Sequence, residues 1–513
     1  MKKILLSFLI ILFINSCSTQ SYLEKGEFSF NKTDHDEIKS NMEFLASDEL
    51  EGREATSRGE QIASLYIATE LKKYGVKPFG DTGTYFQNFE LLSTKLSTES
   101  KIAVSNEEGV LEYNLNIAVD FAVLRRGKSE FDKRHKLLFA GYGISAEEYE
   151  YNDYEDIDAE GKIVIIYSGE PYSINEDFFE GEKQSKYSSP WAKIETAREK
   201  GAEGVLFMPG GQLSAYWGYL SKRSTSESFS LPKSDTEEDS KQIPVVIISP
   251  DIVENIFTSE EYELSEIEET VEENDIPVPF DMEKMLSFNF IIKENLKTAR
   301  NVVGIIEGND EEMNDQFITI GAHYDHEGIV NSKVYNGADD NASGTVCVMN
   351  AAKHLAELNN NKRSILVLLY TAEEKGIFGS NYFVNNFDEI DDVVVNVNLD
   401  MVGRQSVDTI FCIGADRVSN EFNKIVKESN ANSANYFLDY SLSDTRLFYQ
   451  SDHYSFAKNN IPVVFFFDNM RIDLHKPTDD YDKLNYEKIY KTSLLVQNIA
   501  LRVANLDHDL VID

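Results

Sequence analysis

The sequence predicts an α/β protein with a mixed, largely parallel main sheet, helices on both faces of that sheet, and a small β-rich domain inserted into the chain. From Arg300 onward, short runs of almost continuous apolar residues alternate with stretches of helical periodicity. Strands that are apolar along their whole length are typical of sheets covered on both faces, and their alternation with helices is typical of the α/β class. Between residues 110 and 290 most apolar runs are short and strand-like, which indicates the inserted domain.

Changes of composition divide the chain into five segments. At 513 residues it is too long for one ordinary domain. The predicted segments are a signal sequence at 1–17, a polar tether at 18–35, the first part of the main domain at 36–109, the inserted domain at 110–290 and the rest of the main domain at 291–513.

The first seventeen residues, "MKKILLSFLIILFINSC", indicate export and a lipid anchor. A basic start is followed by an apolar run that is too short to span a bilayer, as in a secretory signal. "INSC" resembles a bacterial lipobox, which predicts cleavage before Cys17 and lipid on its thiol. Ser18 offers no inner-membrane retention signal, so the expected location is the outer membrane, facing the periplasm or the surface. Plain secretion is the alternative.

Composition excludes some partners. The net charge of −40 argues against nucleic acid and anionic membrane surfaces. Acidic runs such as "EEYEYNDYEDIDAE" are expected to be solvated faces. Cys347 and Cys412 lie in apolar stretches, where free cysteine usually behaves as a small buried hydrophobe, although a disulfide between them stays open.

The spacing of apolar residues predicts the individual elements. Steps of three and four residues predict two helices between Asp36 and Tyr74, followed by the helix stop Gly75. The inserted domain has the strands "KLLFAGYGI", "GKIVIIYSG", "GVLFM" and "IPVVIIS" and the helix "WAKIETAREKGA". The last segment has the strands "NVVGIIEG", "QFITIGAHYD", "SILVLLYTAEE", "VVVNVNLDM", "DTIFCIG" and "IPVVFFFD", and the helix "SGTVCVMNAAKHLAEL".

Residues that can bind a metal follow most strands of the last segment. In open α/β sheets, ligands bind at the carboxyl ends of the strands, so these residues should converge in one crevice. Without cations the carboxylates would repel one another, and a set of histidines and carboxylates suits zinc. The residues are His323 and Asp325, Glu373 and Glu374, Asp400, His475, and the pair Asp339 and Asp340 before the helix.

Two histidines and several carboxylates are enough for two metals that share one carboxylate. "YNGADDNASG" can supply a short, rigid bridging aspartate, with its neighbour carried along by the turn. Two such metals can activate one bridging water. In "TAEEKG" one glutamate can bind metal while the other stays free to accept and return a proton.

Six motifs resemble those of the co-catalytic di-zinc aminopeptidase family, which includes bacterial leucyl aminopeptidases and glutamate carboxypeptidases. They are "GAHYDHEG", "YNGADDNASG", "TAEEKGIFGS", "NLDMVG", "YQSDHYSF" and "LHKPTD". The residues from "GYGISAEEYEYNDYEDIDAEGKIVIIYSGEP" to "AREKGAEGVLFM" are similar to the protease-associated domain that many members carry as an insertion. The expected fold is therefore that of a zinc exopeptidase.

The resemblance assigns roles to individual residues. Asp339 would bridge two Zn²⁺ ions. The peptide bond between Asp339 and Asp340 would be cis. His323 and Asp400 would complete one metal site, and Glu374 and His475 the other. Glu373 would be the general acid and base, Asp325 would orient His323, and Ser451 and Asp452 would support the His475 side. Tyr449 is the candidate that would stabilise the oxyanion.

The implied activity is removal of N-terminal residues from peptide substrates. The alternative is a carboxypeptidase or dipeptidase on the same scaffold, which would need a basic pocket with Arg404 or Arg446 as candidates. A non-catalytic peptide-binding relative would lack at least one metal ligand, and the sequence retains all five. The preferred side chain and the oligomeric state do not follow from the sequence.

Overall fold

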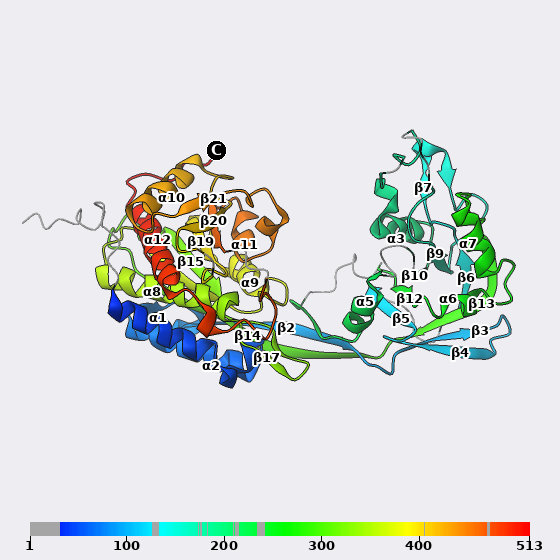
Figure 1. The fold of residues 1–513 in the computed structure, drawn as a ribbon, viewed down its shortest axis with the longest axis horizontal. Coiled ribbons are helices and arrows are strands. Elements are labelled where there is room, and N and C mark those ends of the chain that lie inside the picture. The colour runs from blue at the N-terminus through cyan, green and yellow to red at the C-terminus, as the bar shows by residue number, and fades with distance from the viewer. Residues whose placement is uncertain are drawn as a thin grey trace, which may run out of the picture. The chain divides into compact units, whose positions relative to one another are not determined.

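The chain divides into two compact units in the computed structural model (Figure 1). The structure describes residues 31–125, 133–172, 174, 177–181, 183–208, 210, 215–232, 242–404, 406–468 and 472–513. Unit 1 comprises the chain up to Glu90 and from Lys297 to Asp513, and unit 2 comprises Leu91–Leu296. The predicted signal sequence and Cys17 lie outside the described residues, so lipidation stays a prediction.

The sheet of unit 1 is mixed, and its four central strands are parallel. The strand order is β2 (Phe86–Leu96), β14 (Ile292–Ile306), β18 (Ser364–Tyr370), β15 (Phe317–His323), β19 (Val393–Leu399), β22 (Val463–Phe467), β20 (Thr409–Ile413) and β21 (Phe437–Asp439). The parallel set consists of β18, β15, β19 and β22. On its two sides, β14 is antiparallel to β18, and β20 is antiparallel to β22. β1 (Lys77–Pro78) pairs with β14, and the remainder of β2, in unit 2, pairs with β11 (Ser228–Ser230).

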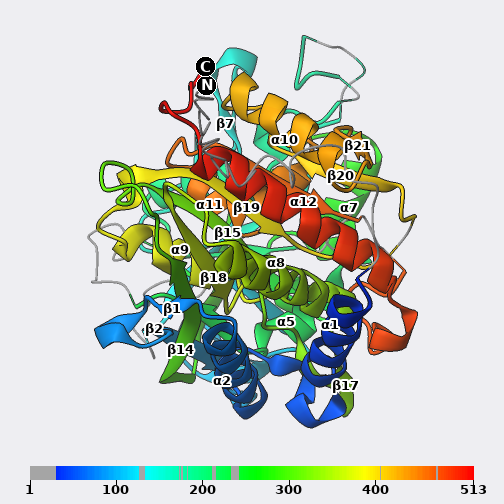
Figure 2. The ribbon, with the colours of Figure 1, turned by 90° about the vertical axis from the view of Figure 1, so that its left-hand side faces the viewer.

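Helices cover both faces of this sheet, as the continuous apolar strands predict. On one face α8 (Gly344–Leu358) and α12 (Tyr486–Ala504) lie side by side with α1 (Lys32–Leu45) (Figure 2), and α2 (Arg58–Lys73) and α10 (Asn420–Asn432) share their core. On the other face α9 (Phe378–Asn386) and α11 (His453–Ala457) bury Phe383 and Phe456 against the strands. The predicted α/β class is confirmed. No helix among the described residues is both long and apolar enough to cross a bilayer.

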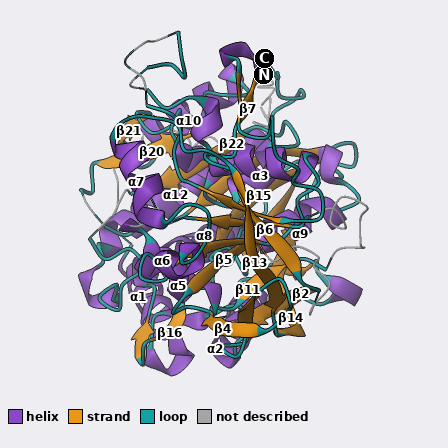
Figure 3. Ribbon diagram, turned by 90° about the vertical axis from the view of Figure 1, so that its right-hand side faces the viewer, coloured by secondary structure: helices purple, strands orange, loops and turns teal. Residues whose placement is uncertain are grey.

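Unit 2 has its own sheet, two larger hydrophobic cores and a smaller third one around Tyr142 and Phe179. The order is β4 (Leu111–Asn116), β3 (Lys101–Ser105), β13 (Phe280–Asn289), β6 (His135–Phe139), β9 (Ile163–Ile166), β10 (Gly204–Phe207), β12 (Val245–Ile248) and β5 (Phe121–Arg125). β6, β9, β10 and β12 are parallel. Figure 3 colours the helices and strands of the chain by type. The helices α6 (Val253–Phe257) and α7 (Leu264–Glu272) pack in one core, and α3 (Pro190–Glu199) and α5 (Trp217–Ser224) in the other.

The structure moves the predicted segment boundaries. Unit 2 begins at Leu91 and ends at Leu296, wider than the predicted 110–290, because the long strands β2 and β14 pass from one unit into the other. Helix α1 begins at Lys32, inside the predicted tether of 18–35, where the Asn31 side chain accepts a hydrogen bond from Thr33. The similarity of unit 2 to protease-associated domains stays a prediction.

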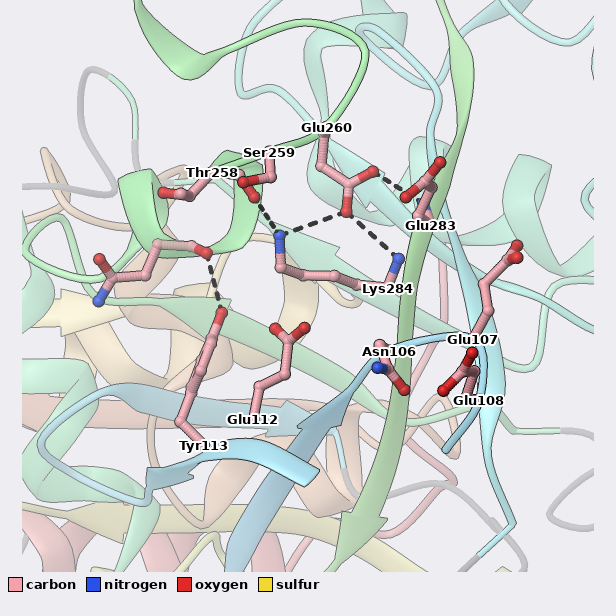
Figure 4. Close-up of a pocket in the computed structure, with 11 residues that line it drawn as sticks. Asn106, Glu107, Glu108, Glu112, Tyr113, Thr258, Ser259, Glu260, Glu283 and Lys284 are labelled. Atoms are coloured by element: carbon pink, nitrogen blue, oxygen red, sulfur yellow. Dashed lines mark hydrogen bonds and ion pairs between the residues drawn. The ribbon is translucent and has the colours of Figure 1, made fainter. Parts of the chain in front are cut away.

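A groove of about 570 Å³ in unit 2 is lined by five glutamates among eleven residues (Figure 4). Two of these carboxylates have basic partners in unit 2. Lys136 pairs with Glu107 at 2.7 Å, and the buried Lys284 lies 3.4 Å from Glu260. The backbone N–H of Glu283 also donates to Glu260. Glu260 belongs to an acidic run of the sequence, but its side chain is 1% exposed and held by these contacts, so this residue is not part of a solvated face.

A buried lysine should make the stability of unit 2 depend on pH. Lys193 is 2% exposed, and its ammonium donates to the carbonyl oxygens of Tyr142 and Gly169. Burial lowers its pKa to about 7, although Asp153 and Glu170 act to raise it. From pH 7 to 9 the folded state loses this proton while the unfolded state keeps it, so stability rises with pH, by about 2 kcal/mol from this group alone.

The variant Lys193→Met cannot show this gain. We expect the unfolding free energy of the wild type, relative to the variant, to rise by about 2 kcal/mol between pH 7 and 9. Both tryptophans of the chain, Trp191 and Trp217, lie in unit 2, so urea unfolding followed by tryptophan fluorescence reports this unit. A difference between the two proteins that stays constant with pH would contradict the prediction.

Candidate metal centre

The four central parallel strands bring their following residues to one edge of the sheet. His323 is the last residue of β15, and Asp400 directly follows β19. Glu373 and Glu374 come just after β18, and His475 lies in the loop after β22. The carboxyl ends of adjacent parallel strands lie at the same edge, and this convergence is the one that the sequence predicts.

Asp340 connects two groups of potential ligands. One carboxylate oxygen, Oδ1, lies 3.5 Å from His323 Nε2, which is itself 3.3 Å from Asp400 Oδ1. The other oxygen, Oδ2, lies 3.3 Å from His475 Nε2, and that nitrogen is 3.1 Å from Glu374 Oε2. Each group therefore contains one histidine and one carboxylate of its own, and both share Asp340.

The prediction that Asp339 is the bridging aspartate is wrong in this geometry. Asp339 is buried, but its Oδ1 accepts a hydrogen bond of 2.8 Å from the N–H of Gly403, and its oxygens belong to neither group. The Asp479 carboxylate accepts from the N–H groups of both aspartates and holds the turn. Successive side chains of this turn point in different directions, so only one of the pair faces the histidines.

The predicted cis peptide is also displaced by one position. The cis bond joins Asp340 to Asn341, not Asp339 to Asp340. The Asn341 side chain donates to the carbonyl oxygen of Leu399 and accepts from the N–H of Gly344 and of Met401. Asn341 therefore connects this turn to the end of β19, next to Asp400.

Buried polar atoms without partners fit a bound cation. His323 Nε2 and Asp400 Oδ1 are buried, and neither makes a hydrogen bond. Burying such atoms without compensation costs free energy. A divalent cation between His323, Asp340 and Asp400 would satisfy both. A second between Asp340, Glu374 and His475 would use the other oxygen of Asp340, and His326 and Glu327 also offer ligand atoms on that side. Imidazole and carboxylate ligands in small sets suit Zn²⁺.

The adjacent glutamates have different surroundings. Burial raises the pKa of Glu373 well above its ordinary value, and the nearby Asp400 and Glu374 raise it further, whereas His323 acts to lower it. Burial would also raise the pKa of Glu374, but hydrogen bonds with His326 and His475 hold it well below its ordinary value. Glu373 Oε2 lies 3.9 Å from His323 Nε2, outside the ligand groups. The pair can therefore provide one ionised ligand and one proton acceptor.

A second layer of contacts orients the ligands, as metal-binding histidines usually need. His326 Nδ1 lies 2.8 Å from Glu374 Oε1, and Glu327 Oε1 lies 3.6 Å from His475 Nδ1. The carbonyl oxygen of Asp325 is 3.2 Å from His323 Nδ1, so the predicted partner is present, although its nearest atom belongs to the backbone. The sequence patterns did not single out Glu327.

Ser451 contacts the group of His323 and Asp400, whereas the sequence predicts that it supports the His475 side. Its hydroxyl donates to Asp400 Oδ2 at 2.9 Å and accepts from the Asn398 side chain. Asp452 is fully buried, and burial raises its pKa to about 7, against the opposing effect of His323. The two residues therefore lie on the side of His323 and Asp400. They directly precede α11, whereas His475 lies in the loop after β22.

The remaining candidates are less constrained by the structure. Tyr449 lies in a short 3₁₀ helix, Arg446–Tyr449, and is 51% exposed, with its ring against Phe448 and Tyr454. Its role at the oxyanion stays a prediction. Arg404 is buried and forms an ion pair with Asp473, whereas Arg446 is exposed.

Sequence comparisons identify one family in the second half of the chain. Residues 301–500 match the sequence model of Peptidase family M28. Aminopeptidase YwaD of Bacillus subtilis is 28% identical over 210 residues, which cover 39% of this chain and 44% of that protein. Leucine aminopeptidase 2 of Arthroderma otae is 32% identical over 120 residues, which cover 23% of this chain and 22% of that protein. The matched regions thus span less than half of these relatives.

Solved structures share the fold over nearly the whole chain. An aminopeptidase from Aneurinibacillus sp. strain AM-1 superposes with a TM-score of 0.56 at 19% identity, covering 94% of this chain and 96% of that chain. BSAP, a zinc aminopeptidase from Bacillus subtilis, gives a TM-score of 0.50 at 18% identity, covering 95% and 100%. At these identities the likeness establishes the fold.

Proposed function

We propose that this chain, whose residues 301–500 match Peptidase family M28, is a zinc-dependent exopeptidase that removes N-terminal residues from peptides. The observation that carries the proposal is the shared position of Asp340 between two groups, each with its own histidine and carboxylate. Glu373, held beside His323 but outside both groups, supplies the base that such a site needs.

The chain's residues divide the work of hydrolysis. Two zinc ions, when bound, would supply Lewis acidity that polarises the substrate carbonyl and lowers the pKa of water. Asp340, His323 and Asp400 would hold one ion, and Asp340, Glu374 and His475 the other. Glu373 accepts the proton of the attacking water and returns it to the leaving amine.

A carboxypeptidase or dipeptidase on the same scaffold is the second candidate. Such an enzyme needs a cation that is free to bind the substrate carboxylate. Arg404 already pairs with Asp473, and Lys483 also lies 3.6 Å from that carboxylate. Arg404 is therefore engaged, and the exposed Arg446 is the candidate that such an enzyme would use.

A peptide digest tests the direction of cleavage. The zinc-loaded protein starting at Ser18 is incubated with peptides in free and N-acetylated form, and products are identified by mass spectrometry. We expect stepwise loss of single N-terminal residues from the free peptides only. Removal of metal with a chelator should abolish cleavage, and added Zn²⁺ should restore it. Trimming from the C-terminus, or activity on dipeptides alone, would overturn the aminopeptidase proposal.

A further inference from the structure

We propose that Arg53, in the N-terminal segment of unit 1, is a positioning residue that holds the loops of the metal centre in register. Its side chain is 1% exposed and donates only to backbone carbonyl oxygens in its hydrogen bonds. This inference rests on the proposed function, because it concerns the same metal centre, but it adds a residue that lies some 270 positions before the first ligand in the chain.

The guanidinium of Arg53 connects two loops that carry metal ligands. Nε donates to the carbonyl oxygen of Tyr324 at 2.8 Å, directly after His323. Nη1 donates to Asn336 at 2.6 Å and Nη2 to Gly337 at 2.8 Å, in the turn that leads to Asp340. Nη1 also donates to Leu45 at the end of α1. The planar guanidinium therefore fixes the spacing between the loop after β15 and the turn that carries Asp340.

The backbone around Arg53 is fitted closely to the same loops. The carbonyl oxygen of Arg53 accepts a hydrogen bond from the N–H of His326. Gly52 has φ +71°, and a Cβ there would lie 2.4 Å from the carbonyl oxygen of Tyr335 and 2.6 Å from that of Gly328. Glu51 and Arg53 also have positive φ, of 50° and 51°. A run of three left-handed residues is uncommon and costs free energy, which the surrounding contacts must offset.

The next residue reaches the third ligand loop. Glu54 pairs with Lys375 at 3.0 Å, and Lys375 directly follows Glu374. Lys375 also lies 3.9 Å from Glu327, whose other carboxylate oxygen lies 3.6 Å from His475. Residues 51–54, which we call the Arg53 loop, thus contact the loops of His323, Asp340 and Glu374 at once.

Arg53 keeps all of its donors at neutral pH. Burial lowers its pKa to about 10, while Asp325, Asp479, Asp340 and Glu374 act to raise it, so the guanidinium stays protonated. A protonated guanidinium has five N–H donors, and Arg53 uses them on the four carbonyl oxygens of these segments.

Lysine cannot replace this group. A guanidinium has five donors in a rigid plane, whereas an ammonium has three donors around one point and cannot reach four carbonyls that arginine spans. Arg53→Lys keeps the positive charge but removes the planar set of N–H donors. We expect its affinity for Zn²⁺ to fall by about 10- to 100-fold, the range typical of partners that orient metal ligands.

Arg363 provides a matched control in the same unit. It is also 1% exposed and also donates to carbonyl oxygens, those of Val503, Leu506 and His508. It precedes β18 directly, whereas Glu373 and Glu374 follow that strand. Arg363→Lys should therefore destabilise the fold to a similar extent and leave zinc affinity unchanged.

The experiment is a competition titration of the metal-free proteins with Zn²⁺ against a chromogenic chelator, with circular dichroism to confirm folding. Weaker binding by Arg53→Lys, with normal binding by Arg363→Lys, is expected. Equal affinity of Arg53→Lys and wild type, or equal weakening in both variants, would overturn the inference. If Arg53→Lys does not fold, the test uses Glu54→Gln, which removes only the pair with Lys375. Unchanged zinc affinity of Glu54→Gln would then overturn the inference. Failure of the wild type itself to bind Zn²⁺ would instead overturn the proposed function.

Discussion

Glu373→Gln should lower kcat by about 10²- to 10⁴-fold, the usual contribution of a general acid and base. Glutamine has the same shape but cannot accept the proton of the attacking water. The Glu373 side chain is 11% exposed, and glutamine has the same size, so the substitution leaves no cavity. Because Glu373 lies outside both ligand groups, zinc affinity should be unchanged. The measurement pairs kcat on a free peptide with a zinc competition titration.

Glu374→Gln is the control for that result. Glu374 lies 3.1 Å from His475 Nε2 and 2.8 Å from His326 Nδ1, within a ligand group. Its substitution should weaken zinc binding as well as activity. A Glu373→Gln protein that keeps full activity, or one that loses zinc to the same extent as Glu374→Gln, would show that the roles of the two glutamates are assigned wrongly.

Asp340→Asn should weaken binding at both metal positions together. Its two oxygens face His323 at 3.5 Å and His475 at 3.3 Å, so an amide replaces one of the two oxygens with a nitrogen that cannot bind metal. The loss of affinity should exceed the roughly 10- to 100-fold that removal of an outer partner causes. Zinc content after dialysis, measured by atomic emission, tests the expectation, and activity should fall with it.

Asp339→Asn distinguishes the two neighbours. Burial raises the pKa of Asp339 well above its ordinary value, and asparagine keeps the oxygen that accepts from Gly403. This variant should therefore retain its zinc. The reverse result, with Asp339→Asn losing zinc and Asp340→Asn keeping it, would restore the bridging role that the family resemblance of the sequence implies for Asp339.

The sequence by itself determined the α/β class, the central strands of the main sheet and the edge at which the site lies. Strands such as β15 and β18 are apolar throughout, and only a sheet covered on both faces buries them. Polar residues directly after such strands lie at the carboxyl edge, so the convergence of His323, Asp400 and His475 followed from order along the chain. Cys347 and Cys412 are buried and free, as their apolar neighbours predicted.

Only the tertiary structure decided which atoms face one another. Asp339 and Asp340 are equivalent as letters in a sequence, and the turn held by Asp479 alone selects the one that faces the histidines. Arg53 carries no metal-binding pattern, because its partners are backbone carbonyls whose positions depend on packing between distant segments. Side-chain direction within a loop and contacts across some 270 residues are properties of the assembled fold, and local periodicity does not contain them.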